Sequence, residues 1–191
     1  MEALEICCAN LYTKSSYIYR AVNNALRDND KTKSATLGPF AFVLFNFIGQ
    51  QSKDNCSMRD RFKRIIHPNK IQSITLYRGD RNCDNTVEEY RQSVGDNSKY
   101  FKWLQFVSTS RNKKVAEKFP GDILYTIEIE SYSSTEDQLT DMTPYSDYPD
   151  EEEILLLPGV QFQVKKVNFD NEKGRHIIDI SINSSYIFKL T

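Results

Sequence analysis

The hydrophobic pattern of the chain changes its period near residue 71, and this change limits the possible folds more than any other feature of the sequence. Before it, apolar residues recur at helical spacing, as Ile18, Val22 and Leu26 do. After it, apolar residues alternate with others, as in residues 123–130, which is the period of a half-buried strand. A helical half followed by a sheet-forming half is typical of the α+β class.

The length of 191 residues favours one domain, with a helical lobe at about residues 10–70 and a sheet core at about residues 71–191. We expect that core to be split into two packed, mostly antiparallel sheets, because its strands alternate in polarity. Pro39 is expected to begin a helix. Helices are predicted over residues 15–27, 39–50, 57–66 and 113–119, and strands over 74–78, 101–107, 123–130, 154–157, 160–165 and 177–182.

Composition excludes several classes of protein. The 25 basic and 26 acidic residues give a net charge of −1, which argues against attachment to nucleic acid by bulk charge. The longest apolar run, residues 40–48, is much shorter than the ~20 residues of a membrane span, so a buried helix is expected there. The first residues resemble no signal peptide. We expect a monomer without a membrane span, cytoplasmic or secreted as an effector or toxin.

The cysteines and histidines do not indicate a metal site. All four cysteines lie in the first half of the chain, and the two histidines do not cluster with them. This spacing suits neither a zinc site nor a dense set of disulfides. We therefore expect no metal ion and a reduced, cytosolic protein.

Charge is distributed unevenly along the chain. Residues 59–70 carry five basic side chains and one acidic one, which favours a solvated helix face over a partner surface. Residues 131–153 carry eight acidic side chains and no basic one. The part of this stretch that we call the acidic loop, residues 131–150, is irregular and about 20 residues long, and compact domains rarely contain such a loop without a functional reason.

Three short motifs follow one another along the chain. Arg78-Gly79 ends one predicted strand, residues 108–110 (Ser-Thr-Ser) end another, and residues 151–153 (Glu-Glu-Glu) open a third. Singly, such motifs are commonly an ion pair, a turn and a solvated face. Together they resemble the Arg-Ser-Glu signature of arginine-specific mono-ADP-ribosyltransferases, a family that includes vertebrate ecto-enzymes and several bacterial toxins. The resemblance covers Tyr12 to about Val167 and includes residues 12–27, 115–119 and 153–164.

This resemblance implies that NAD is a co-substrate and that a protein presenting an arginine is the partner. Cleavage of the nicotinamide–ribose bond passes through an oxocarbenium-like state, which a carboxylate near the ribose stabilises. The resemblance assigns this role to Glu153. Residues two apart in a strand point the same way, so Glu151 is expected to face the site and Glu152 to point away. Glu151 would orient the acceptor guanidinium and draw off a proton, and an acid at this place accompanies arginine modification in the family.

The resemblance implies roles for the other two motifs as well. Arg78 would bind the NAD phosphates or the adjoining ribose, because a forked guanidinium suits an anion. Gly79 would let the backbone approach the nicotinamide amide closely. Ser108 would donate a hydrogen bond to the catalytic glutamate or to the ribose. Thr109 and Ser110 would support the turn and contact NAD.

Five aromatic and amide residues complete the implied site. Phe119 would stack on nicotinamide, although its residue type fits a core position equally well. Tyr19 and Asn23 would reach the phosphates, or could simply pack from one helix face. Tyr145 and Tyr148, in the acidic loop, would recognise the target arginine by stacking on it, with packing of the loop as the alternative.

We therefore interpret the chain as an enzyme that transfers ADP-ribose from NAD to arginine side chains of a target protein. Vertebrate ecto-enzymes of this kind join an N-terminal to a C-terminal cysteine, but no cysteine follows Cys83 here, so that bridge cannot form. Two other hypotheses stay open. One is an NAD glycohydrolase, with water as the acceptor. The other is an inactive binding module that uses the acidic loop or the basic segment, as we call residues 59–70, although a scaffold has no need for Arg78, Ser108, Glu151 and Glu153.

Overall fold

The computed structural model describes residues 2–14, 17–54, 72–81, 86–131 and 139–183. The helix expected over residues 57–66 and the basic segment lie outside these ranges. The helices are α1 (Glu2–Thr13), α2 (Tyr17–Arg27), α3 (Ser34–Asp54), α5 (Thr86–Ser93) and α6 (Lys113–Ala116), with 3-10 turns η1 (Lys31–Lys33), η3 (Thr143–Tyr145) and η4 (Pro149–Glu151). The strands are β1 (Gln72–Asp80), β2 (Phe101–Trp103), β3 (Val107–Ser110), β4 (Ile123–Ser131), β5 (Leu139–Asp141), β6 (Glu153–Leu156), β7 (Val160–Asp170) and β8 (Arg175–Asn183).

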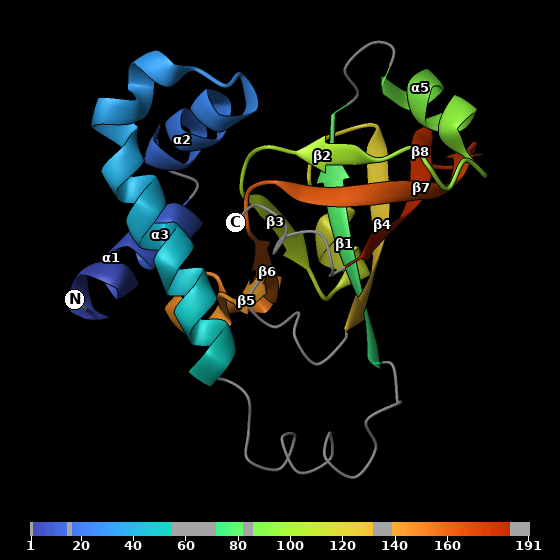
Figure 1. Cartoon of the computed structure of the whole chain (residues 1–191). Coiled ribbons are helices and arrows are strands. Elements are labelled where there is room, and N and C mark those ends of the chain that lie inside the picture. Colours follow the sequence, from blue (N-terminus) through green and yellow to red (C-terminus); the bar gives the residue numbers. More distant parts are fainter. Residues whose placement is uncertain (1, 15–16, 55–71, 82–85, 132–138, 184–191) are drawn as a thin grey trace, which may run out of the picture.

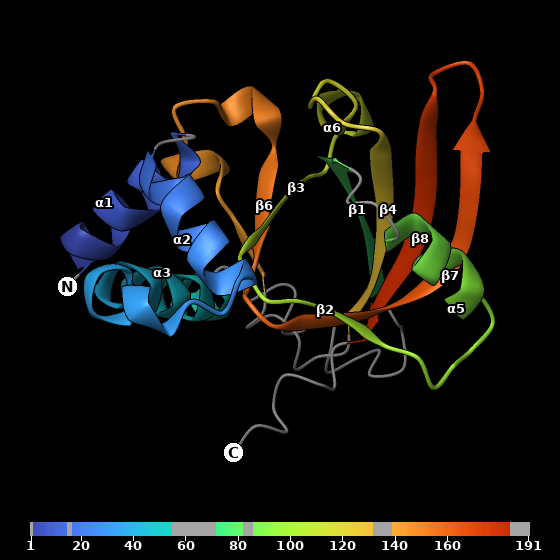
Figure 2. The same ribbon diagram turned by 90° about the horizontal axis from the view of Figure 1, so that it is seen from above.

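The helices α1, α2 and α3 pack together on one side of the sheet, beside β6 and β3 (Figures 1 and 2). The helix α1 was not expected from the sequence, although its buried residues Cys8, Ala9 and Tyr12 have helical spacing. The observed lobe therefore begins nearer the N-terminus than residue 10.

The helix α3 begins earlier than the proline rule predicts. Asp30 caps η1 by accepting a hydrogen bond from the Thr32 backbone, and the chain runs directly from η1 into α3 at Ser34. Pro39 therefore lies inside the helix and does not begin it. A proline there removes one backbone donor, and its ring lies on the exposed side of the helix.

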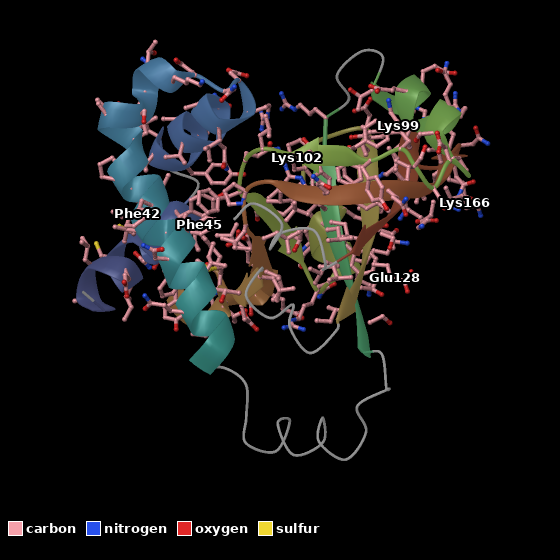
Figure 3. All side chains as sticks on the ribbon, viewed as in Figure 1. Phe42, Phe45, Lys99, Lys102, Glu128 and Lys166 are labelled. Atoms are coloured by element: carbon pink, nitrogen blue, oxygen red, sulfur yellow. The ribbon has the colours of Figure 1, made fainter. Side chains whose placement is uncertain are left out.

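One face of α3 is buried, as expected for the apolar run. Leu44, Phe47 and Ile48 are at most 1% exposed and pack against the sheet and the other helices. The opposite face leaves Phe42 66% and Phe45 43% exposed (Figure 3). None of the helices in the described part of the chain is long and apolar enough to cross a membrane.

The eight strands form one hydrogen-bonded sheet in the order β2-β7-β8-β4-β1-β3-β6-β5. Only the pairing of β4 with β8 is parallel, so the α+β class and the mostly antiparallel character are confirmed. The expected division into two sheets does not appear as a break in pairing. The connection between β1 and β3 consists of a single register pair, Tyr77 with Ser110.

The strand β6 lies between the two hydrophobic cores of the molecule. Ile154 and Leu156 belong to the core of the sheet, whereas Leu155 and Leu157 belong to the core shared with the helices. Neighbouring side chains of a strand point to opposite faces, so β6 can serve both cores only if both of its faces are covered. This explains why residues 153–156 are all buried, without the alternation of a half-exposed strand.

Several boundaries differ from the sequence prediction. The strand expected over residues 101–107 is interrupted, and its two parts are β2 and β3, which pair with different neighbours. The helix α6 ends at Ala116, short of Phe119. Neither α5 nor β5 was predicted. In β5 only three residues pair with β6, which is too short for an alternating pattern to be recognised.

Gly121 provides a test of the packing between β1 and the segment that follows α6, and Gly49 provides the comparison. A Cβ atom at Gly121 would lie 2.1 Å from the backbone oxygen of Asp80, whereas one at Gly49, inside α3, would meet nothing within 4 Å. We predict that Gly121→Ala lowers the free energy of unfolding by about 2 kcal/mol or more, because backbone must move. Gly49→Ala should raise it by about 0.5–1 kcal/mol, because alanine favours a helix. Urea unfolding measures both, and equal effects of the two substitutions would contradict the packing described.

Candidate active site

A pocket opens where β1, β3 and β6 approach α2 and the segment that follows α6. All the predicted site residues except Asn23, Tyr145 and Tyr148 line this pocket. Its lining residues are Tyr19, Tyr77, Arg78, Gly79, Ser108, Thr109, Ser110, Ala116, Phe119, Glu151 and Glu153.

The guanidinium of Arg78 is held by its own strand and by the next one. Nε and Nη2 donate to the Asp80 carboxylate at 3.1 and 2.9 Å, and Nη1 donates to the Ser108 backbone oxygen at 2.8 Å. Burial lowers the pKa of Arg78, but the charge and hydrogen bond of Asp80 together with Tyr19 and Tyr12 raise it by more, so the pKa lies above its ordinary value and the side chain stays charged. Arg78 therefore presents a fixed positive charge to the pocket.

Ser108 and Glu153 connect β3 to β6 inside the pocket. Ser108 Oγ donates to Glu153 Oε1 at 2.5 Å, and the Glu153 side chain is only 7% exposed. Burial raises the pKa of Glu153 to about 7, against the lowering effects of the Ser108 hydrogen bond and of Arg78, and the charge of Glu151 raises it further. At neutral pH this carboxyl group therefore exists in both protonation states.

Glu151 and Glu153 both face the pocket, but strand alternation is not the reason. The strand β6 begins at Glu153, whereas Glu151 ends the 3-10 turn η4. Glu152, between them, has a left-handed backbone with φ of 47°. As expected, Glu152 points away from the pocket, and its Oε1 accepts a hydrogen bond from Asn112 Nδ2 at 3.1 Å. The prediction was right about the directions of the side chains and wrong about the local structure that produces them.

Gly79 lies against the segment that follows α6. A Cβ atom at Gly79 would lie 2.5 Å from the Ala116 backbone oxygen and 3.1 Å from Phe119 Cβ, so only glycine fits. Phe119 is 45% exposed and lines the pocket, so it is not a core residue. Two further hydroxyls donate hydrogen bonds to backbone oxygens on either side of Glu153. Thr109 Oγ1 donates to the Ile154 oxygen and Ser110 Oγ to the Glu151 oxygen, both at 2.7 Å.

The predicted contacts from α2 are divided between the pocket and the core. Tyr19 lines the pocket. Asn23 is buried and donates from Nδ2 to the Tyr12 hydroxyl at 2.8 Å. The Tyr12 ring in turn packs against Tyr19 and Phe106, with ring centroids 4.9 and 5.6 Å apart. In this structure Asn23 supports the aromatic cluster behind the pocket.

The two tyrosines of the acidic loop lie outside the pocket lining. Tyr145 packs edge-on against Phe47 at 4.9 Å, and its backbone oxygen accepts a hydrogen bond from Asn10. Tyr148 is 55% exposed and comes just before η4, whose last residue is Glu151. The loop thus attaches to the helical lobe on one side and leads to the glutamate pair on the other. Residues 132–138 of it are outside the described ranges.

Two residues that contribute to the site were missed by the sequence analysis. Asp80 lies two residues after Arg78 in β1 and therefore on the same face of the strand, a spacing that could have revealed the pair. Tyr12 begins the segment that resembles the family, but no role was assigned to it, because its packing behind the pocket depends on contacts with Tyr19 and Phe106. Among the described residues, no group of three or more His, Cys, Asp or Glu side chains could hold a metal ion.

Comparison with known proteins agrees with this geometry. The model of the family described as NAD:arginine ADP-ribosyltransferase matches residues 5–185. No curated protein matches the chain. Among solved structures, the ADP-ribosyltransferase HopU1 of Pseudomonas syringae pv. Tomato DC3000 superposes with a TM-score of 0.69 at 21% identity, over 93% of this chain and 75% of that one.

Two further structures share the fold. Exoenzyme S from Pseudomonas aeruginosa, in complex with human 14-3-3 protein beta and bound to carba-NAD, gives a TM-score of 0.62 at 20% identity, over 98% of this chain and 76% of that one. The ADP-ribosyltransferase Vis in complex with agmatine gives 0.67 at 15% identity, over 99% and 78%. The fold is therefore that of the ADP-ribosyltransferases. The chain belongs to the NAD:arginine ADP-ribosyltransferase family.

The raised pKa of Glu153 predicts that this residue destabilises the folded protein. The carboxyl group binds its proton more tightly in the folded state, with a pKa of about 7, than in the unfolded chain, so stability is lost as pH rises through 7. Glu153→Gln should therefore raise the free energy of unfolding at pH 8 by as much as about 3 kcal/mol, and by little below pH 4.5. Urea unfolding at both pH values measures this, and an equal effect at the two would contradict the burial argument.

Proposed function

We propose that the chain transfers ADP-ribose from NAD to arginine side chains of a target protein and releases nicotinamide. The observation that carries this proposal is the pair of carboxylates in one pocket, with Glu153 buried and hydrogen-bonded by Ser108 and with Glu151 beside it. The description of the matching family, which names NAD and arginine, supports it. So does the binding of agmatine, a guanidine compound, by the similar structure of Vis.

The pocket offers features that suit NAD. Arg78 supplies a guanidinium held in place by Asp80 and Ser108, and its remaining N–H groups can donate to phosphate or ribose oxygens. At Gly79 the missing side chain lets β1 pack directly against Ala116 and Phe119, and Phe119 lines the pocket with a ring on which a flat aromatic group such as nicotinamide could stack. Exoenzyme S, which has the same fold, binds the NAD analogue carba-NAD.

Glu153 is suited to stabilise the transition state of nicotinamide release. As the bond between nicotinamide and ribose breaks, positive charge develops on the ribose, and a carboxylate nearby gains its strongest attraction at that point. The burial that raises the pKa of Glu153 also removes the water that would screen this attraction. The Ser108 hydroxyl fixes one oxygen of the carboxylate, which leaves the other free to face the ribose.

Glu151 is suited to bring in the acceptor. A guanidinium is always protonated in water and is therefore a poor nucleophile. A carboxylate at the pocket can orient it and take up its proton as the new bond to the ribose forms. With η4 positioning Glu151 next to Glu153, one carboxylate serves bond cleavage and the other serves the acceptor.

Substitution of each glutamate tests this division of roles. We predict that Glu153→Gln lowers both NAD cleavage and transfer to agmatine by about 10²–10³-fold, because a neutral side chain cannot oppose the developing charge. Glu151→Gln should lower transfer by about 10²-fold and leave NAD hydrolysis within about tenfold. Chromatography of labelled products separates free ADP-ribose from modified agmatine.

The exposed Glu128 on β4 provides the matched control, because Glu128→Gln makes the same chemical change outside the pocket (Figure 3). It should leave both rates unchanged. If free ADP-ribose is the only product of the unmodified enzyme with every guanidine acceptor, the glycohydrolase hypothesis replaces this proposal.

The pH dependence of NAD cleavage provides a further test. The reaction needs Glu153 as a carboxylate, so kcat/KM for NAD should rise with pH through a midpoint near the pKa of about 7. Ser108→Ala removes the hydrogen bond that lowers this pKa and should move the midpoint upward. Glu151→Gln removes the negative charge that raises it and should move the midpoint downward. A midpoint below 5 in the unmodified enzyme would contradict the role of Glu153.

A further inference from the structure

The two glutamates of the pocket are held by different means. Glu153 is paired within the sheet, where β6 lies opposite β3. Glu151 precedes the strand, and its own backbone bond is that of a single 3-10 turn, from its N–H to the Tyr148 oxygen at 3.0 Å. The sheet therefore cannot by itself determine where the Glu151 carboxylate lies.

We propose that Asn112 and Glu152 are positioning residues, which hold the turn so that the Glu151 carboxylate stays beside Glu153 and serves the acceptor. This inference rests on the proposed function. It assigns a role to the middle residue of the three glutamates, which neither binds in the pocket nor faces it.

Three consecutive residues, the last residue of β3 and the two that follow it, contact the glutamate turn. Ser110 Oγ donates to the Glu151 backbone oxygen at 2.7 Å, and the Arg111 N–H donates to the Glu152 backbone oxygen at 3.2 Å. Asn112 Nδ2 donates to Glu152 Oε1 at 3.1 Å. The first two bonds hold the backbone of the turn. The third holds the side chain of Glu152, the residue with the left-handed backbone.

The left-handed backbone makes this side-chain contact important. Glutamate adopts a φ of 47° rarely, because the Cβ atom crowds the following carbonyl oxygen. This conformation needs support from its surroundings, and it turns the chain so that Glu151 and Glu153 both reach the pocket while Glu152 does not. A change in φ at Glu152 would rotate Glu151 away from Glu153.

Asn112 is itself held in place from the other side. Its Oδ1 accepts a hydrogen bond from the Lys114 N–H at 3.1 Å and so caps α6, the helix after which Phe119 enters the pocket. The cap determines which way the amide faces, and Nδ2 is then directed at Glu152. One side chain thus connects the beginning of α6 to the glutamate turn.

An exchange of the two partners tests the proposal. Asn112→Asp keeps a good helix cap but places an oxygen opposite the Glu152 carboxylate, so the contact becomes repulsive. We expect transfer to agmatine to fall about 10–100-fold, while NAD hydrolysis stays within about threefold. Glu152→Gln alone retains Oε1 as an acceptor and should behave like the unmodified enzyme. The double substitution restores a hydrogen bond of reversed polarity and should recover transfer to within about threefold.

The exposed Asn168 on β7 gives the matched control, since Asn168→Asp adds the same charge outside the pocket and should change neither rate. Unchanged transfer in Asn112→Asp would overturn the proposal. So would a double variant as impaired as Asn112→Asp, because the loss would then come from the charge at position 112 and not from the broken contact.

Failure of the proposed function is distinguishable from failure of this inference. If the unmodified enzyme cleaves NAD but modifies no guanidine, the function fails, and the pH midpoint of NAD hydrolysis then tests the positioning of Glu151 beside Glu153. In that case Asn112→Asp should shift the pH midpoint of NAD hydrolysis. The double variant also carries the carboxylate at position 112, but it should return the midpoint to its value in the unmodified enzyme. A midpoint that is the same in all variants would overturn the inference.

Discussion

The burial of one carboxyl group, that of Glu153, is the constraint on which the rest of the structure depends. Glu153 is the first residue of β6, the strand that contributes side chains to both hydrophobic cores. Its side chain therefore cannot move into solvent without disturbing these cores. Within the described part of the chain its side chain accepts one hydrogen bond, from the Ser108 hydroxyl, and the effect of burial outweighs that hydrogen bond, so the pKa of Glu153 is raised. The fold thus keeps in place a group that would be more stable in water, as is common where charge is needed for chemistry.

Three adjacent strands deliver the motifs that are far apart in the sequence. Arg78 on β1 donates to the backbone of Ser108 on β3, and the Ser108 hydroxyl donates to Glu153 on β6. Because β1, β3 and β6 are neighbours in that order, the three motifs lie side by side across the sheet in the same order as along the chain. Because β1 and β3 share only one register pair, the Arg78 contact is one of the few connections between the two parts of the sheet.

Much of this arrangement could be predicted from the sequence. The strands β1, β4 and β7 show clear alternation, and the three motifs led to most of the pocket lining. Prediction from the sequence failed where contacts distant along the chain decide the structure. It missed α1, which is stabilised by packing of Cys8, Ala9 and Tyr12, and it assigned Glu151 to a strand because a left-handed residue cannot be recognised from an ordinary glutamate. It left open whether Asn23 contacts the cofactor or packs, and in the structure the Asn23 side chain donates a hydrogen bond to the Tyr12 hydroxyl.

The hydrophobic periodicity indicated the α+β class, and the family resemblance of the three motifs indicated most residues of the pocket and the chemistry they favour, because such patterns are local properties of the chain. Three features follow from the folded arrangement alone: the pairing of the strands into one continuous sheet, the pKa of about 7 for Glu153, and the position of Glu151 on a turn held by Asn112 and Glu152. Each of these depends on groups brought together from separate segments, since burial and hydrogen-bond partners do not exist until the chain has folded.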